Sequence, residues 1–548
     1  YDCPMKRILV TVSLLFVVTT IYACTSLLAG RKATVDGSTL ITYAADSHTL
    51  YGALSFTPAA DHPKGSKIEI RDCDTNKPLG KIPQVEHTYK VVGFMNEHQL
   101  SITESTFGGR PELVDTTGII DYGSLMQLAL QRARTAREAI TVMTDLVKKY
   151  GYYSSGESFS IADPEEVWIL EMIGKGSASK GAVWVAVRIP DDCIAAHANH
   201  SRIHRFPLDD PENCLYSPDV ISFAREQKYF AGLNRDFSFS AAYAPADFEE
   251  LRACEARVWS FYNRYDSTMV SYLPYIYGES STPLPLYIKP DRKLSVQDMK
   301  DAMRDHFEGT PFDMTQDAGA GPFKAPYRFR PMTFEVDSQE YINERAIATQ
   351  QTGFSLVAQQ REWLPAALGG VLWFGVDDAN TSVYVPIYVG ALTEVPLCFR
   401  EGNGSLYKVS WTSAFWVYNW VANMAYARYD QMIEDIRPLQ RQIETAFNEQ
   451  QPKLEQGVLE IFYDQPEKAL AVLDKYSREA ADSSTVRWRE LGEYLLVKYL
   501  DGNRKREKDG QFMYNAYGIP EYPEFPGYSE EFYRTIVEDA GDRLKVSF

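Results

Sequence analysis

The sequence predicts an α+β fold, with strands through the first three quarters of the chain and helices dominating its end. Three observations lead to this prediction. Short β-prone runs recur from residue 24 to residue 390, helical spacing occupies residues 124–151, and two long amphipathic runs follow residue 411. We find no internal repeat that would indicate a solenoid.

The chain opens with features of a secretory signal peptide. Met5, Lys6 and Arg7 form a basic start, and residues 8–18 read ILVTVSLLFVV. This run is shorter than the roughly 20 residues that span a bilayer, and no later run is longer. We therefore assign residues 1–23 to upstream sequence and signal peptide. We expect an exported bacterial protein, periplasmic, surface-bound or secreted, without an integral membrane segment.

Composition describes a globular protein with an acidic surface. The 548 residues are 45% hydrophobic and 24% charged, and the formal net charge is −18. A negative surface repels nucleic acid and anionic lipid, so we exclude both as partners. The sequence leaves homo-oligomerisation open.

The first predicted element is a hairpin that begins at Cys24. The run CTSLLAG is strand-like, and the Asp36-Gly37 pair is typical of a tight turn before STLITYAAD. Further predicted elements follow in chain order, with a glycine ending the helix. They are strands at 90–106, 158–174, 182–199, 354–376 and 382–390, and a helix at 124–151.

The chain divides into a body at 24–410 and a C-terminal helical region at 411–548, which we expect to pack on that body. Residues 205–290 are rich in Pro, Tyr and Asp, which predicts an irregular insertion within the body.

Six cysteines follow the leader, and an exported protein permits disulfides. Cys193 and Cys214 are the closest pair, but the sequence assigns no pairing. The sequence contains no CxxC motif that would indicate a zinc site.

Cys24 follows the predicted cleavage site directly, and three interpretations compete. Ile21-Tyr22-Ala23-Cys24 resembles a lipidation signal, Cys24 could form a disulfide, or cleavage could create a nucleophile. Lipoproteins usually continue into a flexible polar tether, whereas TSLLAG predicts a strand. A chain end held in a sheet favours the nucleophile.

The nucleophile hypothesis has a chemical basis. Cleavage after Ala23 would leave Cys24 with a free α-amine beside its own thiol. The α-amine has a pKa near 8 and the thiol a pKa near 8.5, so the amine can take the thiol proton. One residue then supplies both nucleophile and general base.

The mature chain resembles the cysteine dipeptidases (peptidase D type) of the N-terminal nucleophile hydrolase superfamily. Choloylglycine hydrolases and penicillin V acylases are more distant relatives. The resemblance covers nearly the whole mature chain, and the order of its segments is specific. These are CTSLLAGRKATVDGSTLITYAADSH, GFMNEHQLSITEST, RIPDDCIAAHANHSRI, RDHFEGTPFD, ERAIATQQTGFSLVAQQREWLP, GGVLWFG, YVPIY and FWVYN.

The resemblance implies a four-layer αββα sandwich that carries the nucleophile at the end of a central strand. It implies hydrolysis of short peptides, chiefly dipeptides, through an acyl-enzyme on Cys24. It implies neither metal nor organic cofactor.

The resemblance also assigns roles to residues. Asp46 matches the acid that holds the nucleophile's amine or thiol. Asn199 matches the amide that binds the oxyanion or substrate carbonyl, and Thr106 lies where acylase relatives carry a second such asparagine. From the sequence alone, a turn or cap role is favoured for Asp46, and a turn role for Asn199 is as well supported as a functional one. Asn96 is better explained as a turn residue.

One position departs from the family pattern. Relatives usually read Arg-Asn-Glu-Asp where this chain has Tyr43-Ala44-Ala45-Asp46. The missing arginine would lower the pKa of the thiol, whereas a tyrosine hydroxyl only forms hydrogen bonds. Arg345 is the candidate replacement cation, and a salt bridge to Glu344 or another surface acid is the alternative that we favour.

Other chemistries have weak support. His197, His200 and His204 have H-x2-H-x3-H spacing, but alternate strand residues point to opposite faces, so we predict no metal site. HExxH and G-x-S-x-G motifs are absent.

Two rival functions remain. An amide hydrolase could remove acyl groups from small amines, as the acylase relatives do. A surface lipoprotein could use an inactive hydrolase fold to bind a ligand.

Overall fold

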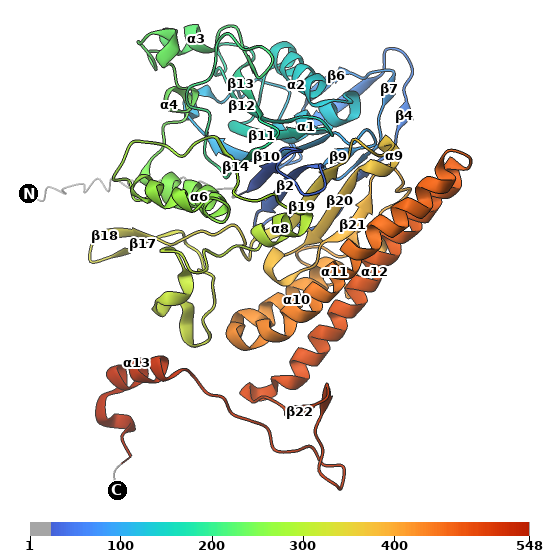
Figure 1. Ribbon diagram of the computed structural model, residues 1–548. Coiled ribbons are helices and arrows are strands. Elements are labelled where there is room, and N and C mark those ends of the chain that lie inside the picture. The colour runs from blue at the N-terminus through green and yellow to red at the C-terminus, as the bar shows by residue number, and fades with distance from the viewer. Residues whose placement is uncertain (1–23, 547–548) are drawn as a thin grey trace, which may run out of the picture.

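The computed structural model describes residues 24–546 and shows an α+β protein built around two antiparallel sheets (Figure 1). The predicted signal peptide at 1–23 lies outside the described residues. The first sheet has seven strands, in the order β16 (Tyr287–Ile288), β14 (Ile194–His197), β1 (Ser26–Ala29), β2 (Thr39–Asp46), β19 (Thr352–Gln360), β20 (Val371–Val376) and β21 (Val385–Tyr388).

The second sheet has eight strands and faces the first. Its order is β15 (Cys214–Tyr216), β13 (Ala182–Ile189), β12 (Val167–Gly174), β11 (Gly156–Ala162), β10 (Ser101–Gly108), β9 (Met95–Asn96), β8 (Val91–Val92) and β3 (Phe56–Thr57). Strand β2 contacts both β10 and β11, and every residue of β2 is buried. The central strands therefore lie inside the molecule.

Helices pack on the second sheet where one helical region was predicted. The segment forms α1 (Tyr122–Arg132) and α2 (Ala136–Tyr150), broken at Ala133. The Thr135 hydroxyl caps the start of α2, and Gly151 ends it with φ of 81°. Helix α2 contacts β11, β12 and β13, which closes one side of the core.

The predicted first hairpin is present, but its connection is longer than a tight turn. Strands β1 and β2 pair antiparallel, with Leu28 opposite Ile41. Residues 30–38 form the connection, in which Asp36 accepts a hydrogen bond from the Ser38 backbone and Gly37 has φ of 87°. The loop is extended because the Lys32 and Ala33 amides bond to the Asp191 carbonyl.

Residues 182–199 form two strands in different sheets. Strand β13 lies in the eight-stranded sheet and β14 in the seven-stranded sheet, where it pairs with β1. A turn closed by the Cys193 amide and the Pro190 carbonyl redirects the chain between them. This crossing brings residues that follow β14 close to the start of β1.

The segment predicted as an irregular insertion contains several short helices. Among them α6 packs against β14, so this part of the chain reaches the sheet that carries β1. The helices are α3 (Val220–Glu226), α4 (Phe239–Tyr243), α5 (Phe248–Glu250), α6 (Ala256–Asn263) and α7 (Leu273–Ile276).

Three long helices follow residue 411, where two long amphipathic runs were predicted, and they pack on the first sheet. They are α10 (Ala414–Ala427), α11 (Tyr429–Phe462) and α12 (Pro466–Lys498). Helix α10 contacts β20, and both α11 and α12 contact β21. Tyr418, Trp488 and Leu495 are fully buried in the main core.

The remaining C-terminal segment is not helical throughout, which corrects the prediction. It forms β22 (Glu507–Lys508), β23 (Gln511–Phe512) and the short helix α13 (Glu530–Ala540), which has no buried residue. Figure 1 shows this segment extending away from the sheets. Its sequence has turn formers such as Gly510 and Gly518, both with positive φ.

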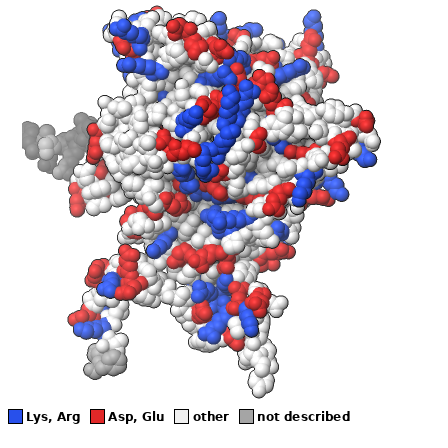
Figure 2. Space-filling model, in the orientation of Figure 1, with Lys and Arg blue, Asp and Glu red and all other residues white. Residues whose placement is uncertain are grey.

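Between residues 24 and 546, no helix is long and apolar enough to cross a membrane. All six cysteines in this range are free thiols, so the structure shows no disulfide there. Figure 2 shows acidic and basic side chains interspersed over the visible face.

Candidate active site

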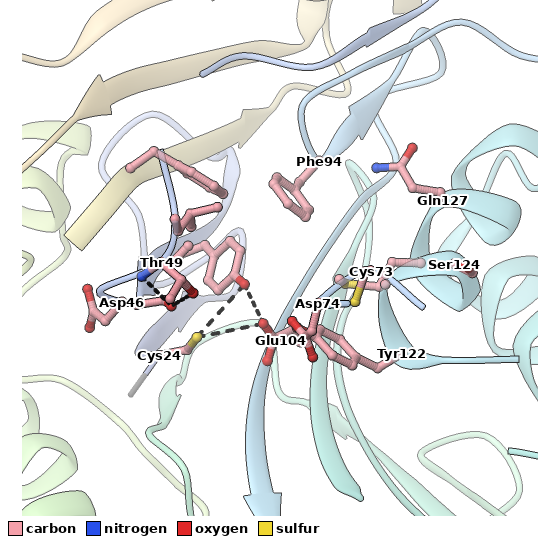
Figure 3. Close-up of a pocket in the computed structure, with 17 residues that line it drawn as sticks. Cys24, Asp46, Thr49, Cys73, Asp74, Phe94, Glu104, Tyr122, Ser124 and Gln127 are labelled. Carbon is pink, nitrogen blue, oxygen red and sulfur yellow. Dashed lines mark hydrogen bonds between the residues drawn. The ribbon is translucent and has the colours of Figure 1, made fainter. Parts of the chain in front are cut away.

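Cys24 lies at the edge of a cavity of about 430 Å³, immediately before β1 (Figure 3). Its side chain is 5% exposed. Strand β2 contributes Tyr43 and Asp46 to the cavity, and β10 contributes Glu104. The remaining lining residues are Ala45, Ser47, Thr49, Leu50, Cys73, Asp74, Phe94, Tyr122, Gly123, Ser124, Met126, Gln127 and Phe354.

The surroundings of Cys24 keep its thiol protonated. Burial raises the pKa of the thiol well above its ordinary value, and the carboxylates of Glu104 and Asp46 raise it further. Contacts of the thiol with the Asp46 backbone and with the Tyr43 hydroxyl oxygen act in the opposite direction. The thiol sulfur lies 3.7 Å from Glu104 Oε1 and 3.9 Å from the Tyr43 hydroxyl oxygen.

Asp46 and Arg345 form a buried ion pair next to the cavity. Arg345 donates from Nη2 to Asp46 Oδ2, and the Thr352 hydroxyl donates to Oδ1 at 2.6 Å. Both ionic side chains are at most 4% exposed. The favoured alternative for Arg345 is wrong, because Glu344 pairs with Arg252 instead. Arg345 therefore neutralises the predicted catalytic acid.

Asn199 joins the site through an arginine that sequence reasoning missed. Arg257, from α6, donates from Nη1 to the Cys24 carbonyl at 2.8 Å and from Nη2 to Asn199 Oδ1 at 3.0 Å. Asn199 has φ of 60° and donates from Nδ2 to the Thr106 carbonyl at 2.8 Å. Because Oδ1 accepts from Arg257, the orientation of the amide is set.

Arg257 uses every donor of its guanidinium group. Its other bonds reach the Thr25 hydroxyl at 2.7 Å, the Ala198 carbonyl at 3.0 Å and the Ala253 carbonyl at 2.7 Å. Burial and the nearby Arg345 lower its pKa to about 10, so it remains charged at neutral pH. No local motif marked Arg257, since it lies in the predicted irregular insertion.

Tyr43, Glu104 and Glu157 form a second group that the sequence did not reveal. The Tyr43 hydroxyl donates to Glu104 Oε1. Glu104 also contacts the carboxyl of Glu157, on β11, and burial raises the pKa of both acids. The segment GFMNEHQLSITEST contains Glu104, but its pattern drew attention to Asn96 and Thr106.

Thr106 does not line the cavity. Its hydroxyl donates to Glu157 Oε1 at 2.6 Å, so the side chain supports the acidic pair. Asn96 is a turn residue, as expected: its Oδ1 accepts from the His98 and Leu100 amides.

The three histidines of the H-x2-H-x3-H pattern do not converge within the described chain. His197 contacts the hydroxyls of Ser105 and Ser160 at 2.6 and 2.7 Å, and burial lowers its pKa to about 3. His200 faces Glu250, whereas the ring of His204 contacts Ser238.

Asp72, Cys73 and Asp74 bring three ligand-type atoms within 4.8 Å of one another at the rim of the cavity. Asp72 Oδ1 already accepts from the Asp74 and Thr75 amides, which explains its position as a turn residue.

Comparison with known proteins agrees with this arrangement. The sequence model of peptidase family C69 matches residues 23–442, a region that starts one residue before Cys24. The chain belongs to peptidase family C69. It is therefore a cysteine-type peptidase of the N-terminal nucleophile class that hydrolyses peptide bonds.

Relatives within family C69 are named as dipeptidases. The chain is 26% identical to a probable dipeptidase of Salmonella dublin over 408 residues, covering 70% of this chain and 85% of the relative. It is 26% identical to a probable dipeptidase of Latilactobacillus sakei over 425 residues, covering 74% of this chain and 82% of that relative. It is 25% identical to dipeptidase A of Lactobacillus helveticus over 414 residues, covering 71% of this chain and 80% of that relative.

Proposed function

We propose that this family C69 protein is an exported thiol dipeptidase whose nucleophile is an N-terminal Cys24. The observation that carries the proposal is the position of Cys24, two residues before the central strand β1 and at the edge of a cavity. The two facing sheets, with helices packed on each, are consistent with the αββα sandwich of N-terminal nucleophile hydrolases.

The reaction follows from the groups around Cys24. The Cys24 α-amine takes the thiol proton while the sulfur attacks the scissile carbonyl carbon. The same amine then protonates the leaving amine as the peptide bond breaks, which leaves a thioester on Cys24. Water attacks the thioester and releases the amino acid, which restores the thiol.

Two neighbouring residues assist this reaction in our proposal. The Asn199 amide, oriented by Arg257, donates to the oxyanion that forms during attack. Asp46, held by Arg345, lies near the mature N-terminus and orients the Cys24 amine. Neither step requires a metal ion or an organic cofactor.

The structure favours a free Cys24 over a lipidated one. A lipoprotein cysteine carries its acyl chains on a flexible tether, whereas Cys24 is 5% exposed and followed directly by β1. Lipid chains on this sulfur would have to pass through the cavity. Acylation of the amine would also remove the base.

Mature protein recovered from cells and offered a panel of dipeptides tests the proposal. We expect N-terminal sequencing to start at Cys24, intact mass to show no lipid, and dipeptides to be hydrolysed. Cys24→Ala should lower kcat by at least about 10³-fold, since no nucleophile remains. Cys193→Ser, a thiol away from the cavity, is the matched control and should retain activity.

Three results would contradict this proposal. They are a mature chain that starts elsewhere, a diacyl adduct on Cys24, and undiminished turnover by Cys24→Ala. A preference for N-acyl amino acids over dipeptides would instead support the rival amide hydrolase.

A further inference from the structure

The cavity beside Cys24 has an unusual charge balance. The described residues that line it include three acids, Asp46, Asp74 and Glu104, and no lysine, arginine or histidine. Asp46 is neutralised by Arg345, and Asp74 accepts from the Tyr122 hydroxyl at 3.0 Å. Such a cavity favours a cationic group and disfavours an anionic one.

Glu104 is the acid closest to the reacting atoms. Its Oε1 lies 3.7 Å from the Cys24 sulfur. Its Oε2 is buried, and no N–H or O–H group of the described residues donates a hydrogen bond to it. The carboxyl groups of Glu104 and Glu157 contact each other, and burial raises the pKa of both, to about 7 for Glu104 and well above the ordinary value for Glu157. Glu104 is therefore the member of the pair that ionises first.

Among the described residues, no lysine, arginine or histidine donates a hydrogen bond to Glu104 or Glu157. The partners of the pair are the hydroxyls of Tyr43 and Thr106 and the Cys24 thiol, which are all uncharged donors. A buried carboxylate without a cation is costly, and its cost is relieved when a cationic ligand enters the site.

The covalent geometry of a dipeptide places a cation at this point. Its α-ammonium nitrogen is about 2.5 Å from the scissile carbonyl carbon, because only the α-carbon separates them. That carbon approaches the attacking sulfur to about 3–3.5 Å. The ammonium therefore lies within about 6 Å of the Cys24 sulfur, in the range that Glu104 Oε1 can reach.

We propose that Glu104, supported by Tyr43 and Glu157, binds the α-ammonium group of the substrate's N-terminal residue. The bound ammonium also supplies the positive charge beside Cys24 that Tyr43 does not provide. This inference rests on the proposed function, and it assigns to Glu104 the selection of substrates with a free N-terminus.

The consequence for Cys24 follows from the sign of the charges. Burial, and after it the carboxylates of Glu104 and Asp46, raise the pKa of the thiol, which disfavours the thiolate. An ammonium next to Glu104 offsets the contribution of that carboxylate and stabilises the thiolate by charge proximity. The thiol is thus activated when a substrate with a free amine is bound, and N-acylated peptides leave it protonated.

A matched pair of substrates isolates this subsite. The first is the dipeptide that the wild-type enzyme hydrolyses fastest in the panel, and the second is its des-amino analogue, in which hydrogen replaces the α-amine. We measure kcat/KM for both with wild type, Glu104→Gln and Glu69→Gln. Glu69 is an acid on β5 (Lys67–Arg71), outside the cavity, and serves as the matched control.

We expect wild type and Glu69→Gln to prefer the dipeptide by about 10- to 100-fold, the range for a hydrogen bond between charged groups. Glu104→Gln should reduce this preference to within about threefold, because kcat/KM falls for the dipeptide and stays unchanged for the des-amino analogue. Equal loss on both substrates, or an unchanged preference, would overturn the assignment, as would a wild type that does not discriminate.

The pH dependence of wild type provides a second test that does not depend on the folding of Glu104→Gln. For the dipeptide, kcat/KM should fall as the substrate α-amine loses its proton near pH 8, and this decline should be absent for the des-amino analogue. Identical profiles would overturn the subsite. Failure of the proposed function is distinguishable, because then wild type hydrolyses no dipeptide or Cys24→Ala stays active.

Discussion

At the scale of single residues, the contacts around Cys24 set both the charge environment of its thiol and the orientation of its backbone. Cys24 has a thiol whose pKa is raised by burial and by two acids, so the side chain alone is a poor nucleophile. Arg257 binds both the Cys24 carbonyl and Asn199, so one side chain connects the proposed nucleophile with the proposed oxyanion donor. Arg257 is in this sense a positioning residue.

Replacing Arg257 by lysine should show whether the positive charge of Arg257 or the geometry of its hydrogen bonds matters for activity. Arg257→Lys keeps the positive charge but cannot form the paired bonds to Cys24 and Asn199. We expect kcat to fall by about 10²-fold with KM changed much less, because the loss concerns the transition state. Stoichiometric labelling of Cys24 by iodoacetamide, followed by mass spectrometry, reports the fraction of intact sites.

Arg202→Lys is the matched control for this prediction. Arg202 is another fully buried arginine with several bonds, and it pairs with Glu255 instead of contacting Cys24. If kcat per labelled site falls by the same factor in Arg257→Lys and Arg202→Lys, Arg257 has only a general structural role and the proposed positioning role is wrong.

At the scale of elements, strand ends bring the polar groups together. Asp377 directly follows β20, has φ of 64° and lies buried, and Asn419 Nδ2 donates to its Oδ1 at 2.9 Å. Burial raises its pKa to about 8. The folded state therefore retains a proton on Asp377 between about pH 4 and pH 8, where the unfolded chain has released it.

This proton predicts how stability depends on pH. Because the folded state binds more protons in that window, the contribution of Asp377 to stability is present at low pH and is lost as the pH rises through about 8. Asp377→Asn keeps the left-handed backbone and the acceptor for Asn419. The free energy of unfolding of Asp377→Asn should therefore decline less steeply with rising pH than that of wild type, by up to about 1.4 kcal/mol per pH unit.

Urea unfolding at several pH values measures this slope. Asp209→Asn, at an exposed position, is the control and should leave the slope unchanged. A slope that is the same in wild type and Asp377→Asn would show that Asp377 is ionised in the folded protein.

At the scale of the whole molecule, the C-terminal helices belong to the core. Their buried side chains join the same hydrophobic cluster as the strands β1 and β2. Two buried ion pairs also connect helix α11 to earlier parts of the chain: Arg304 with Glu444, and Arg361 with Glu455. Breaking such pairs leaves buried charges without partners.

Truncation distinguishes the helices from the segment that follows them. A chain ending at residue 410 should lack a cooperative unfolding transition and activity, because the outer face of the first sheet would be exposed. A chain ending at residue 502 should retain both, since α13 buries no residue. Thermal unfolding and dipeptide hydrolysis check this, and a folded, active chain ending at 410 would contradict it.

The sequence by itself determined the class of fold, and it singled out Cys24 as the candidate nucleophile. Local patterns marked the β1–β2 hairpin, the main strands, the α2 terminus and the long C-terminal helices, since alternation and helical spacing are local properties. The resemblance pointed to Cys24, Asp46 and Asn199. In the structure Cys24 and Asp46 line one cavity, and Arg257 links Asn199 to the Cys24 carbonyl.

Only the tertiary structure decided which charges surround Cys24. Arg257 comes from a segment that no motif marked, and Glu104 meets Glu157 across two paired strands. Arg345 pairs with Asp46, 299 positions away in the chain, although Glu344 is its neighbour in sequence. Ion pairs and contacts between acids depend on distance and burial in space, and these follow from how the two sheets and the helices pack.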